Sequence, residues 1–198
     1  MTLQSILAVL ISYLLGSIST SYWITKLLKG TDIRSQGSGN AGATNMLRVV
    51  GKGPAAIVFI LDMLKGMAAV GIASLMDVDP AVIMLSGLAA VVGHNWPIFL
   101  GFRGGKGIAT TIGVMILLTF LAAVIAGVVA ILIILLTRYV SLGSLFFAAI
   151  LPLLIAVLDY PTSFIYISLL VTLLAFLRHA SNIKRLINGT ENKMSSSK

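Results

Sequence analysis

The sequence predicts an all-α integral membrane protein with seven transmembrane helices, several of them short. Of its 198 residues, 58% are hydrophobic and only 10% are charged, and the mean hydropathy is +1.05. A chain of this composition has too few polar side chains to cover a globule in water. The apolar residues form long runs, and the basic residues gather between alternate runs, as expected for a protein with a fixed orientation in a membrane.

The apolar runs follow one another with short polar interruptions. The first run lacks a basic leading segment and is longer than the apolar part of a signal peptide, so we expect a retained helix. The second begins near Pro54, a residue that suits the first turn of a helix. The predicted apolar segments cover residues 3–28, 54–76, 81–100, 108–137, 145–158 and 164–177.

The run of residues 108–137 is too long for one upright crossing and short for two crossings of about 20 residues each. Charge placement decides between the two. Of the 14 Lys and Arg residues, Lys65 lies inside a run and Lys26 near the end of the first run, and the others lie between or after the runs. Asp77, Asp79 and Asp159 occupy turns without a base. If this run crosses twice, every basic cluster falls on one side, which the positive-inside rule makes the cytoplasm. We therefore predict seven crossings, with the N-terminus outside and the C-terminus cytoplasmic.

This topology belongs to a single membrane-embedded domain, residues 1–198. It places four polar segments on the cytoplasmic side, where they can converge. These are the glycine-rich segment 37–48, the loop 103–107, the segment 138–144 and the C-terminal segment. The sequence therefore predicts a functional site at the inner face.

The first polar segment, residues 37–48, reads GSGNAGATNMLR. Its glycines allow tight turns that bring backbone N–H groups close to a ligand. Arg48 adds a planar fork of donors suited to phosphate or carboxylate. Such a loop binds an anion as a nest or at the start of a following helix. A flexible connector between two membrane helices is the alternative.

The second motif, residues 93–107, reads GHNWPIFLGFRGGKG. Its three glycines around Lys106 resemble a phosphate-binding turn, although their spacing is not that of a Walker A loop. A membrane anchor with a turn is the alternative. A lone histidine such as His94 is more often a hydrogen-bond partner at a helix end than a base.

The third motif, residues 179–191, reads HASNIKRLINGTE. At about 100° per residue, His179, Asn182 and Arg185 follow one stripe of a helix and can present an imidazole, an amide and a guanidinium to one ligand. Glu191 is placed to pair back with Arg185 or Lys184. The alternative is a basic amphipathic tail that lies on anionic lipid.

Asp62 and Lys65 lie three residues apart inside the second span, and we expect them to pair so that neither charge is isolated in lipid. The sequence offers no carboxylate cluster for Mg²⁺ and no Cys/His spacing for zinc, so neither a metal nor a cofactor is expected. Neither histidine is followed by the Asp of the soluble acyltransferase pattern His-x4-Asp. The remaining groups suit holding phosphates and stabilising an oxyanion.

Together, the three motifs GSGNAGATNMLR, GHNWPIFLGFRGGKG and HASNIKRLINGTE resemble those of the bacterial acyl-phosphate:glycerol-3-phosphate acyltransferases, in order and across nearly the whole chain. The resemblance implies a small seven-span enzyme of the bacterial cytoplasmic (inner) membrane. Such an enzyme moves a fatty acyl group from acyl phosphate to the 1-hydroxyl of glycerol 3-phosphate. Its products are lysophosphatidic acid, for phospholipid biosynthesis, and phosphate. The sequence departs from the family pattern at two positions. Ala41 stands where the family has Pro, and Arg103 stands where the family often has Lys. Neither difference removes a charge.

The expected partners are fatty acyl phosphate, glycerol 3-phosphate and membrane lipid, without nucleic acid, and a monomer suffices. By resemblance, the predicted catalytic residues are Ser38, Lys106, His179 and Asn182. The predicted substrate-binding residues are Gly37, Gly39, Asn40, Gly42, Thr44, Asn45, Arg48, His94, Gly104, Gly105, Gly107, Ser144, Arg185 and Glu191. Of these, Arg185 and Glu191 are expected to act mainly on structure, and Ser144 to be a lesser contact.

Two questions stay open at this stage. We expect a substrate phosphate oxygen to take the proton of the acceptor hydroxyl, and the competing hypothesis makes His179 the base. The other reading of the whole chain is a small anion transporter, with the same loops acting as a gate. Transporters place their substrate near the midplane between internal repeats, whereas the polar residues here gather at one face and no repeat is evident.

Overall fold

The structure, a computed structural model, describes residues 2–194 and is helical in all of its regular elements there. It comprises two compact units, divided between Leu118 and Thr119. The first unit contains α1 (Leu3–Gly16), α2 (Thr20–Lys29), η1 (Ile33–Ser35), α3 (Ala43–Val49), α4 (Lys52–Ser74), α5 (Pro80–Asn95), η2 (Ile98–Leu100) and α6 (Ile108–Leu118). The second contains α7 (Phe120–Thr137), α8 (Val140–Val157), α9 (Thr162–Arg178) and α10 (Ala180–Ile187). The single domain expected from the sequence stays a prediction.

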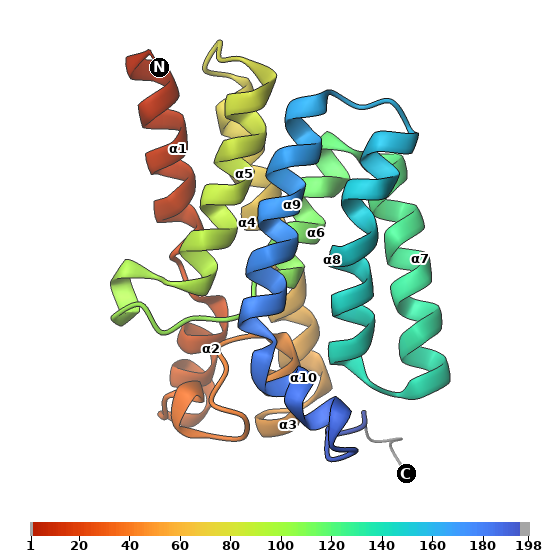
Figure 1. Cartoon of the computed structure of the whole chain (residues 1–198). Coiled ribbons are helices and arrows are strands. Elements are labelled where there is room, and N and C mark those ends of the chain that lie inside the picture. The colour runs from red at the N-terminus through yellow and green to blue at the C-terminus, as the bar shows by residue number, and fades with distance from the viewer. Residues whose placement is uncertain (1, 195–198) are drawn as a thin grey trace. The chain divides into compact units, whose positions relative to one another are not determined.

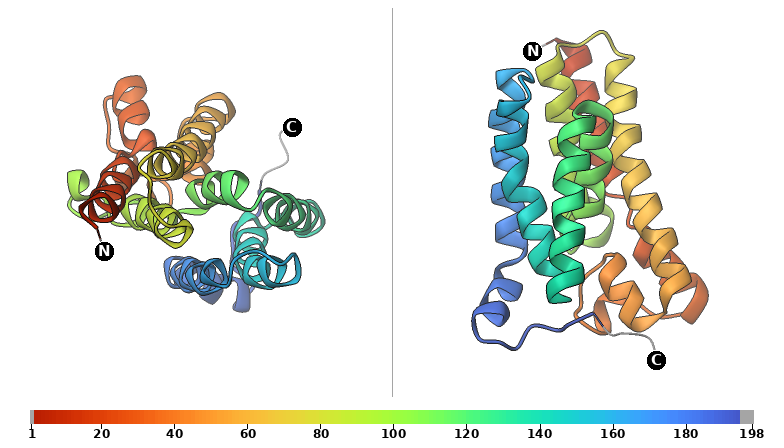
Figure 2. Two further views of the ribbon diagram at one scale, coloured as in Figure 1. Left: turned by 90° about the horizontal axis from the view of Figure 1, so that it is seen from above. Right: turned by 90° about the vertical axis from the view of Figure 1, so that its right-hand side faces the viewer.

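In the first unit, α1 packs against α5, and α4 packs against α1, α5 and α6. Glycines bring these backbones close together: a Cβ on Gly93 would lie 2.9 Å from the Ser17 nitrogen, and one on Gly66 3.1 Å from the Thr110 carbonyl carbon. Small residues at such crossings are typical of helices packed in a membrane. The short elements α2, α3 and η1 lie at the end of this unit away from the N-terminus (Figures 1 and 2). The glycine-rich segment 37–48 is therefore held at that end.

In the second unit, α8 packs between α7 and α9 and contributes the fully buried side chains Phe147 and Ile155. The chain bends by 62° between α9 and α10, and α10 contacts both α8 and α9. The last described residue, Met194, donates its backbone N–H to the carbonyl of Arg138 at 2.7 Å. The segment after α10 is thereby tied to the junction of α7 and α8.

By length and composition, five helices can cross a membrane within the described residues, or six if the bent pair α9–α10 is one span. The first of them joins α1 and α2. The short apolar helix α6 would make a seventh crossing. The all-helical membrane class is confirmed, whereas the number of crossings and the orientation stay predictions.

The ambiguous run of residues 108–137 forms two helices, α6 and α7, separated at the buried Thr119, whose φ of −140° and ψ of 57° are not helical. The two-crossing prediction requires such a break. The single helix expected over residues 3–28 is wrong in detail, because the chain breaks between Gly16 and Thr20. The Ser17 hydroxyl there donates to the carbonyl of Tyr13 at 2.9 Å, and the run's overall hydropathy concealed this interruption.

The loop expected around Ser141 and Ser144 is also wrong, because α8 already begins at Val140. Within α8, Gly143 allows close packing, because a Cβ there would lie 2.7 Å from the Ala130 carbonyl oxygen of α7. Ser144 donates to the Val140 carbonyl of its own helix at 2.9 Å. Its hydroxyl is thus engaged within α8.

Candidate active site

The glycine-rich segment 37–48 is organised around Asn45, which is 1% exposed on α3. The Asn45 Oδ1 accepts a hydrogen bond from the backbone N–H of Ser38 at 2.8 Å. Its Nδ2 donates to the carbonyls of Gln36 at 3.0 Å and Ile33 at 3.2 Å. Gly37 has a φ of +58°, and a Cβ on it would overlap Asn45 Oδ1. Asn45, predicted to bind substrate, therefore holds the conformation of the loop through hydrogen bonds to its backbone. Ser38 is exposed.

Arg34 ties this loop to the segment after α5. Its Nη1 donates to the carbonyl of Leu100 at 2.7 Å, and its Nη2 lies 2.8 Å from Asp32 Oδ2. The hydrogen bond from Arg34 holds the pKa of the Asp32 carboxyl below its ordinary value, against the opposing effect of burial. This pair is not among the residues predicted from the sequence, although an Asp and an Arg two residues apart, next to a glycine-rich loop, are a recognisable signal.

The second glycine segment folds back onto the end of α5. The backbone N–H of Gly105 donates to the carbonyl of His94 at 3.0 Å, and that of Gly104 to the carbonyl of Asn95 at 3.2 Å. A Cβ on Gly105 would overlap His94 Nε2 and lie 2.8 Å from the carbonyl oxygen of Ala41. The two glycine segments predicted to bind anions therefore meet at Gly105, and Lys106 follows it, half-buried.

A buried charged cluster lies beneath this junction. Lys65 Nζ is 3.0 Å from Asp62 Oδ1, which confirms the pair expected from their spacing. The Thr20 hydroxyl donates to the same carboxylate oxygen at 2.7 Å. Lys65 Nζ also lies 2.9 Å from His94 Nδ1. Sequence reasoning missed Thr20 and the link to His94, because neither is close to the pair along the chain.

In the second unit, His179 lies at the bend between α9 and α10 and is 2% exposed. Its Nδ1 is 2.7 Å from the carbonyl oxygen of Ala175. A carbonyl only accepts, so Nδ1 carries the proton of this hydrogen bond. In the neutral ring, Nε2 is then the acceptor.

The rest of the third motif converges on Glu191, which is 7% exposed. Its Oε1 accepts from Asn182 Nδ2 at 2.6 Å and from the Ser141 hydroxyl at 2.8 Å, and its Oε2 accepts from Arg185 Nε at 2.7 Å. Burial raises the pKa of Glu191, but these three hydrogen bonds and the Arg185 charge outweigh it and hold the pKa below its ordinary value. Of the two partners expected for Glu191, Arg185 and Lys184, the structure shows Arg185, and the Ser141 hydroxyl joins the cluster.

The other predicted residues differ in exposure. Gly37, Gly39 and Arg48 are exposed, Asn40 and Thr44 are half-buried, and Gly42 and Gly107 are buried. Asn95 was missed: it is fully buried, and among residues 2–194 neither its Oδ1 nor its Nδ2 has a hydrogen-bond partner. A Cβ on Gly107 would lie 2.9 Å from that Oδ1. Over the same residues, the structure assembles no group of three or more His, Cys, Asp or Glu side chains that could hold a metal ion.

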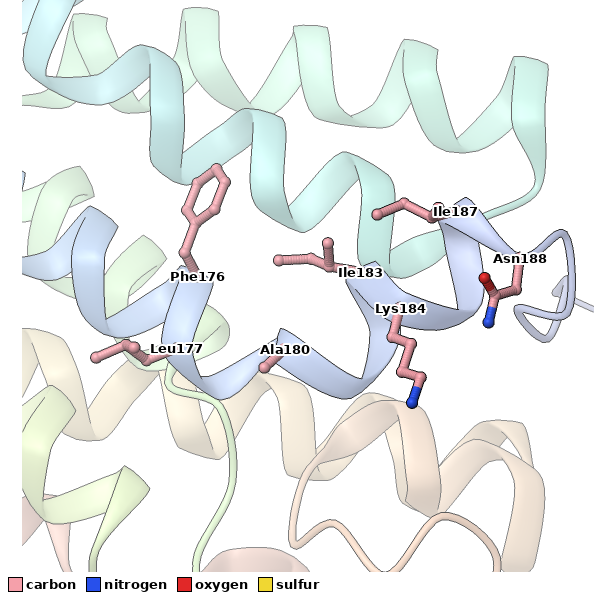
Figure 3. A pocket seen from close by; sticks show the side chains of 7 residues that line it. All are labelled: Phe176, Leu177, Ala180, Ile183, Lys184, Ile187 and Asn188. Carbon is pink, nitrogen blue, oxygen red and sulfur yellow. The ribbon is translucent and has the colours of Figure 1, made fainter.

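A surface pocket of about 420 Å³ lies along the bent pair α9–α10. Its lining side chains come from both sides of the bend (Figure 3). They are Phe176, Leu177, Ala180, Ile183, Lys184, Ile187 and Asn188. The pocket is therefore apolar apart from one ammonium and one amide.

Comparison with known proteins identifies the family. Residues 6–189 match the family described as Glycerol-3-phosphate acyltransferase. A protein of that name from Halalkalibacterium halodurans is 56% identical over 95% of this chain and 94% of its own, and one from Shouchella clausii is 54% identical over 98% of each.

A crystal structure of PlsY, an integral membrane glycerol 3-phosphate acyltransferase in its glycerol 3-phosphate form, matches with a TM-score of 0.92. It is 40% identical and covers 96% of both chains. Its lysophosphatidic acid form matches with a TM-score of 0.89. The chain described here, a multi-pass integral membrane protein, therefore belongs to the glycerol-3-phosphate acyltransferase family.

Proposed function

We propose that this glycerol-3-phosphate acyltransferase, which forms lysophosphatidic acid, takes its fatty acyl group from acyl phosphate. The acceptor is the 1-hydroxyl of glycerol 3-phosphate. The hydroxyl oxygen attacks the acyl carbon, the bond from that carbon to the phosphate oxygen breaks, and inorganic phosphate leaves. The proton of the hydroxyl goes to a phosphate oxygen of the substrate.

The observation that carries this proposal is the meeting of the two glycine segments at Gly105, beside Lys106. Two glycine segments that approach each other without side chains, next to a lysine, suit the close approach of a phosphate. Because acyl phosphate is a mixed anhydride and already activated, positioning and neutralisation of charge supply much of the rate. Ser38 and Arg48, both exposed near this junction along the chain, are proposed to complete the phosphate contacts.

The third motif is proposed to orient the acceptor. The hydrogen bond between its Nδ1 and the Ala175 carbonyl fixes the orientation of the buried His179 ring, which is proposed to position the acceptor hydroxyl. The hydrogen bond from Asn182 Nδ2 to Glu191 Oε1 at 2.6 Å fixes the side chain of Asn182, which is proposed to orient the acceptor beside His179. The apolar pocket along α9–α10 has the lining expected of a site for an acyl chain.

The seven crossings, the external N-terminus, the cytoplasmic C-terminus and the location in the inner membrane are part of the same proposal. They are supported by the placement of the basic residues and by the break at Thr119. With this orientation, all three motifs emerge on the cytoplasmic face. Fatty acyl phosphate, glycerol 3-phosphate and membrane lipid are the proposed partners.

The deciding experiment measures phosphate release from palmitoyl phosphate by the purified protein, with and without glycerol 3-phosphate. We expect release that depends on the acceptor, with an equal amount of lysophosphatidic acid. Absence of release, together with uptake of glycerol 3-phosphate into proteoliposomes, would support the transporter instead. Lys106→Met should lower kcat/KM by at least ten-fold, whereas the matched control Lys52→Met, at an exposed lysine that begins α4, should leave it unchanged.

The function of His179 is tested by kinetics of His179→Ala. A raised KM for glycerol 3-phosphate with a modest loss of kcat agrees with orientation of the acceptor. Loss of nearly all kcat with unchanged affinity for glycerol 3-phosphate would make His179 the general base.

A further inference from the structure

We infer that Lys65, Asp62 and Thr20 are positioning residues that hold the His94 imidazole as its Nε2–H tautomer at the junction of the two glycine segments. The inference rests on the proposed function, in which this junction receives a phosphate. The cluster lies outside the three motifs except for His94, so motif-based reasoning assigns no function to its other members.

The first step concerns the donors of Lys65. Its side chain is 9% exposed, and its ammonium has three N–H donors and no acceptor. Three acceptors surround it: the Ile18 carbonyl oxygen at 2.8 Å, Asp62 Oδ1 at 3.0 Å and His94 Nδ1 at 2.9 Å. The ammonium is thus fully satisfied only if it donates to His94 Nδ1.

The second step follows from the chemistry of imidazole. A ring nitrogen that accepts a hydrogen bond carries no proton, so the proton of the neutral ring is on Nε2. An imidazolium would direct an Nδ1–H donor at the ammonium of Lys65, which is unfavourable in a buried site. Asp62 lies 3.7 Å from Nδ1 and is itself fixed by Thr20 at 2.7 Å. The ring therefore cannot turn without breaking this cluster.

The third step connects the ring to the two glycine segments. The Nε2 edge of His94 lies against Gly105, beside the carbonyl oxygen of Ala41. The backbone carbonyl of His94 also accepts the N–H of Gly105 at 3.0 Å. His94 thus braces the second segment through both its ring and its backbone, directly before Lys106. Through it, the buried pair on α4 determines where the loop residues lie.

The two histidines of this chain provide an internal comparison, since there are only two. His179 Nδ1 donates to the carbonyl of Ala175, so its neutral form has the opposite tautomer, with the proton on Nδ1. A protein labelled with ¹⁵N-histidine therefore contains one ring of each kind. Protonated and unprotonated ring nitrogens differ in ¹⁵N chemical shift and in coupling to hydrogen, and His179→Gln assigns the two sets of signals.

The first experiment is this ¹⁵N spectrum of the wild-type protein near neutral pH. We expect His94 to show a protonated Nε2 and an unprotonated Nδ1, and the His179 pattern to be reversed. A proton on His94 Nδ1 would overturn the inference. This measurement needs no variant in the cluster and so does not depend on whether such a variant folds.

The second experiment removes the pair together, as Asp62→Asn with Lys65→Met, so that no buried charge is left unpaired. We expect His94 to lose its single tautomer and kcat/KM to fall by ten- to a hundred-fold in the folded protein, because the loop is no longer held in place. The control is Ser12→Ala, which removes a buried hydroxyl that contacts the Ala69 carbonyl of α4 at 3.4 Å. It should affect stability alone.

A double variant that keeps both the tautomer and the wild-type kcat/KM would overturn the inference. If the double variant does not fold, Thr20→Val removes only the donor to Asp62 and should give a smaller loss of kcat/KM, measured in the same way. Failure of the proposed function is distinguishable, because wild-type protein would then form no lysophosphatidic acid from palmitoyl phosphate. The ¹⁵N spectrum would still report the tautomer of His94.

Discussion

Gly105→Ala is the substitution whose consequence follows most directly from the structure. The added Cβ would overlap His94 Nε2 and lie 2.8 Å from the Ala41 carbonyl oxygen, and real Cβ contacts are not found below 3.0 Å. Both neighbours would have to withdraw by roughly 1 Å to restore ordinary contact distances. The ring of His94 cannot easily move away, because its Nδ1 lies 2.9 Å from Lys65 Nζ.

The expected magnitude follows from the cost of overpacking, which is about 1–3 kcal/mol for an added methyl in a filled site. If about 2 kcal/mol is lost from binding of the transition state, kcat/KM falls by roughly 30-fold. The same cost to the fold would lower the midpoint of thermal unfolding by about 4–8 °C for a chain of this length.

The assay is acceptor-dependent phosphate release from palmitoyl phosphate, with thermal unfolding measured on the same detergent-solubilised samples. Gly53→Ala is the matched control, because a Cβ on this α4 glycine meets no atom within 4 Å among the described residues. It should keep full activity and gain up to about 1 kcal/mol of stability. Activity of Gly105→Ala within three-fold of wild type would refute the close meeting of the two glycine segments.

Three further predictions concern the ion pairs. Glu191→Gln turns an amide N–H toward Arg185 Nε, so that two donors face each other. In thermal denaturation it should lower the unfolding midpoint by about 5 °C, equivalent to about 1–2 kcal/mol. An unchanged midpoint would contradict a stabilising cluster. The folded-state pKa of Glu191 is below its ordinary value of 4.5, so its stabilisation is complete above that value and is lost as the pH falls through the lowered pKa. The difference in midpoint between wild type and Glu191→Gln should therefore shrink below about pH 4.5, and a constant difference down to pH 2 would argue against this linkage. Arg34→Met removes the donor to the Leu100 carbonyl and should raise KM for glycerol 3-phosphate several-fold in steady-state kinetics. An unaltered KM would show that the hydrogen bond from Arg34 to Leu100 does not position the glycine-rich loop.

The sequence by itself determined the membrane class, most of the helical runs and the pair of Asp62 with Lys65, and it limited the partner of Glu191 to Arg185 or Lys184. Each depends on hydropathy or on short spacing along one chain segment, which a sequence displays directly. It also located the three motifs, because clusters of glycine, amide and cationic residues stand out in an apolar chain. The sequence did not reveal the break at Ser17 or the early start of α8 at Val140, since helix packing rather than composition decides where those helices begin and end.

Tertiary structure alone decided which distant groups meet. Thr20 reaches Asp62 across 42 residues, Lys65 reaches His94 across 29, and Ser141 reaches Glu191 across 50. Nothing in local periodicity specifies such contacts, because they depend on how whole helices pack around close glycine crossings. The tautomers of His94 and His179 follow from these contacts, since the partner of one ring nitrogen determines which nitrogen carries the proton.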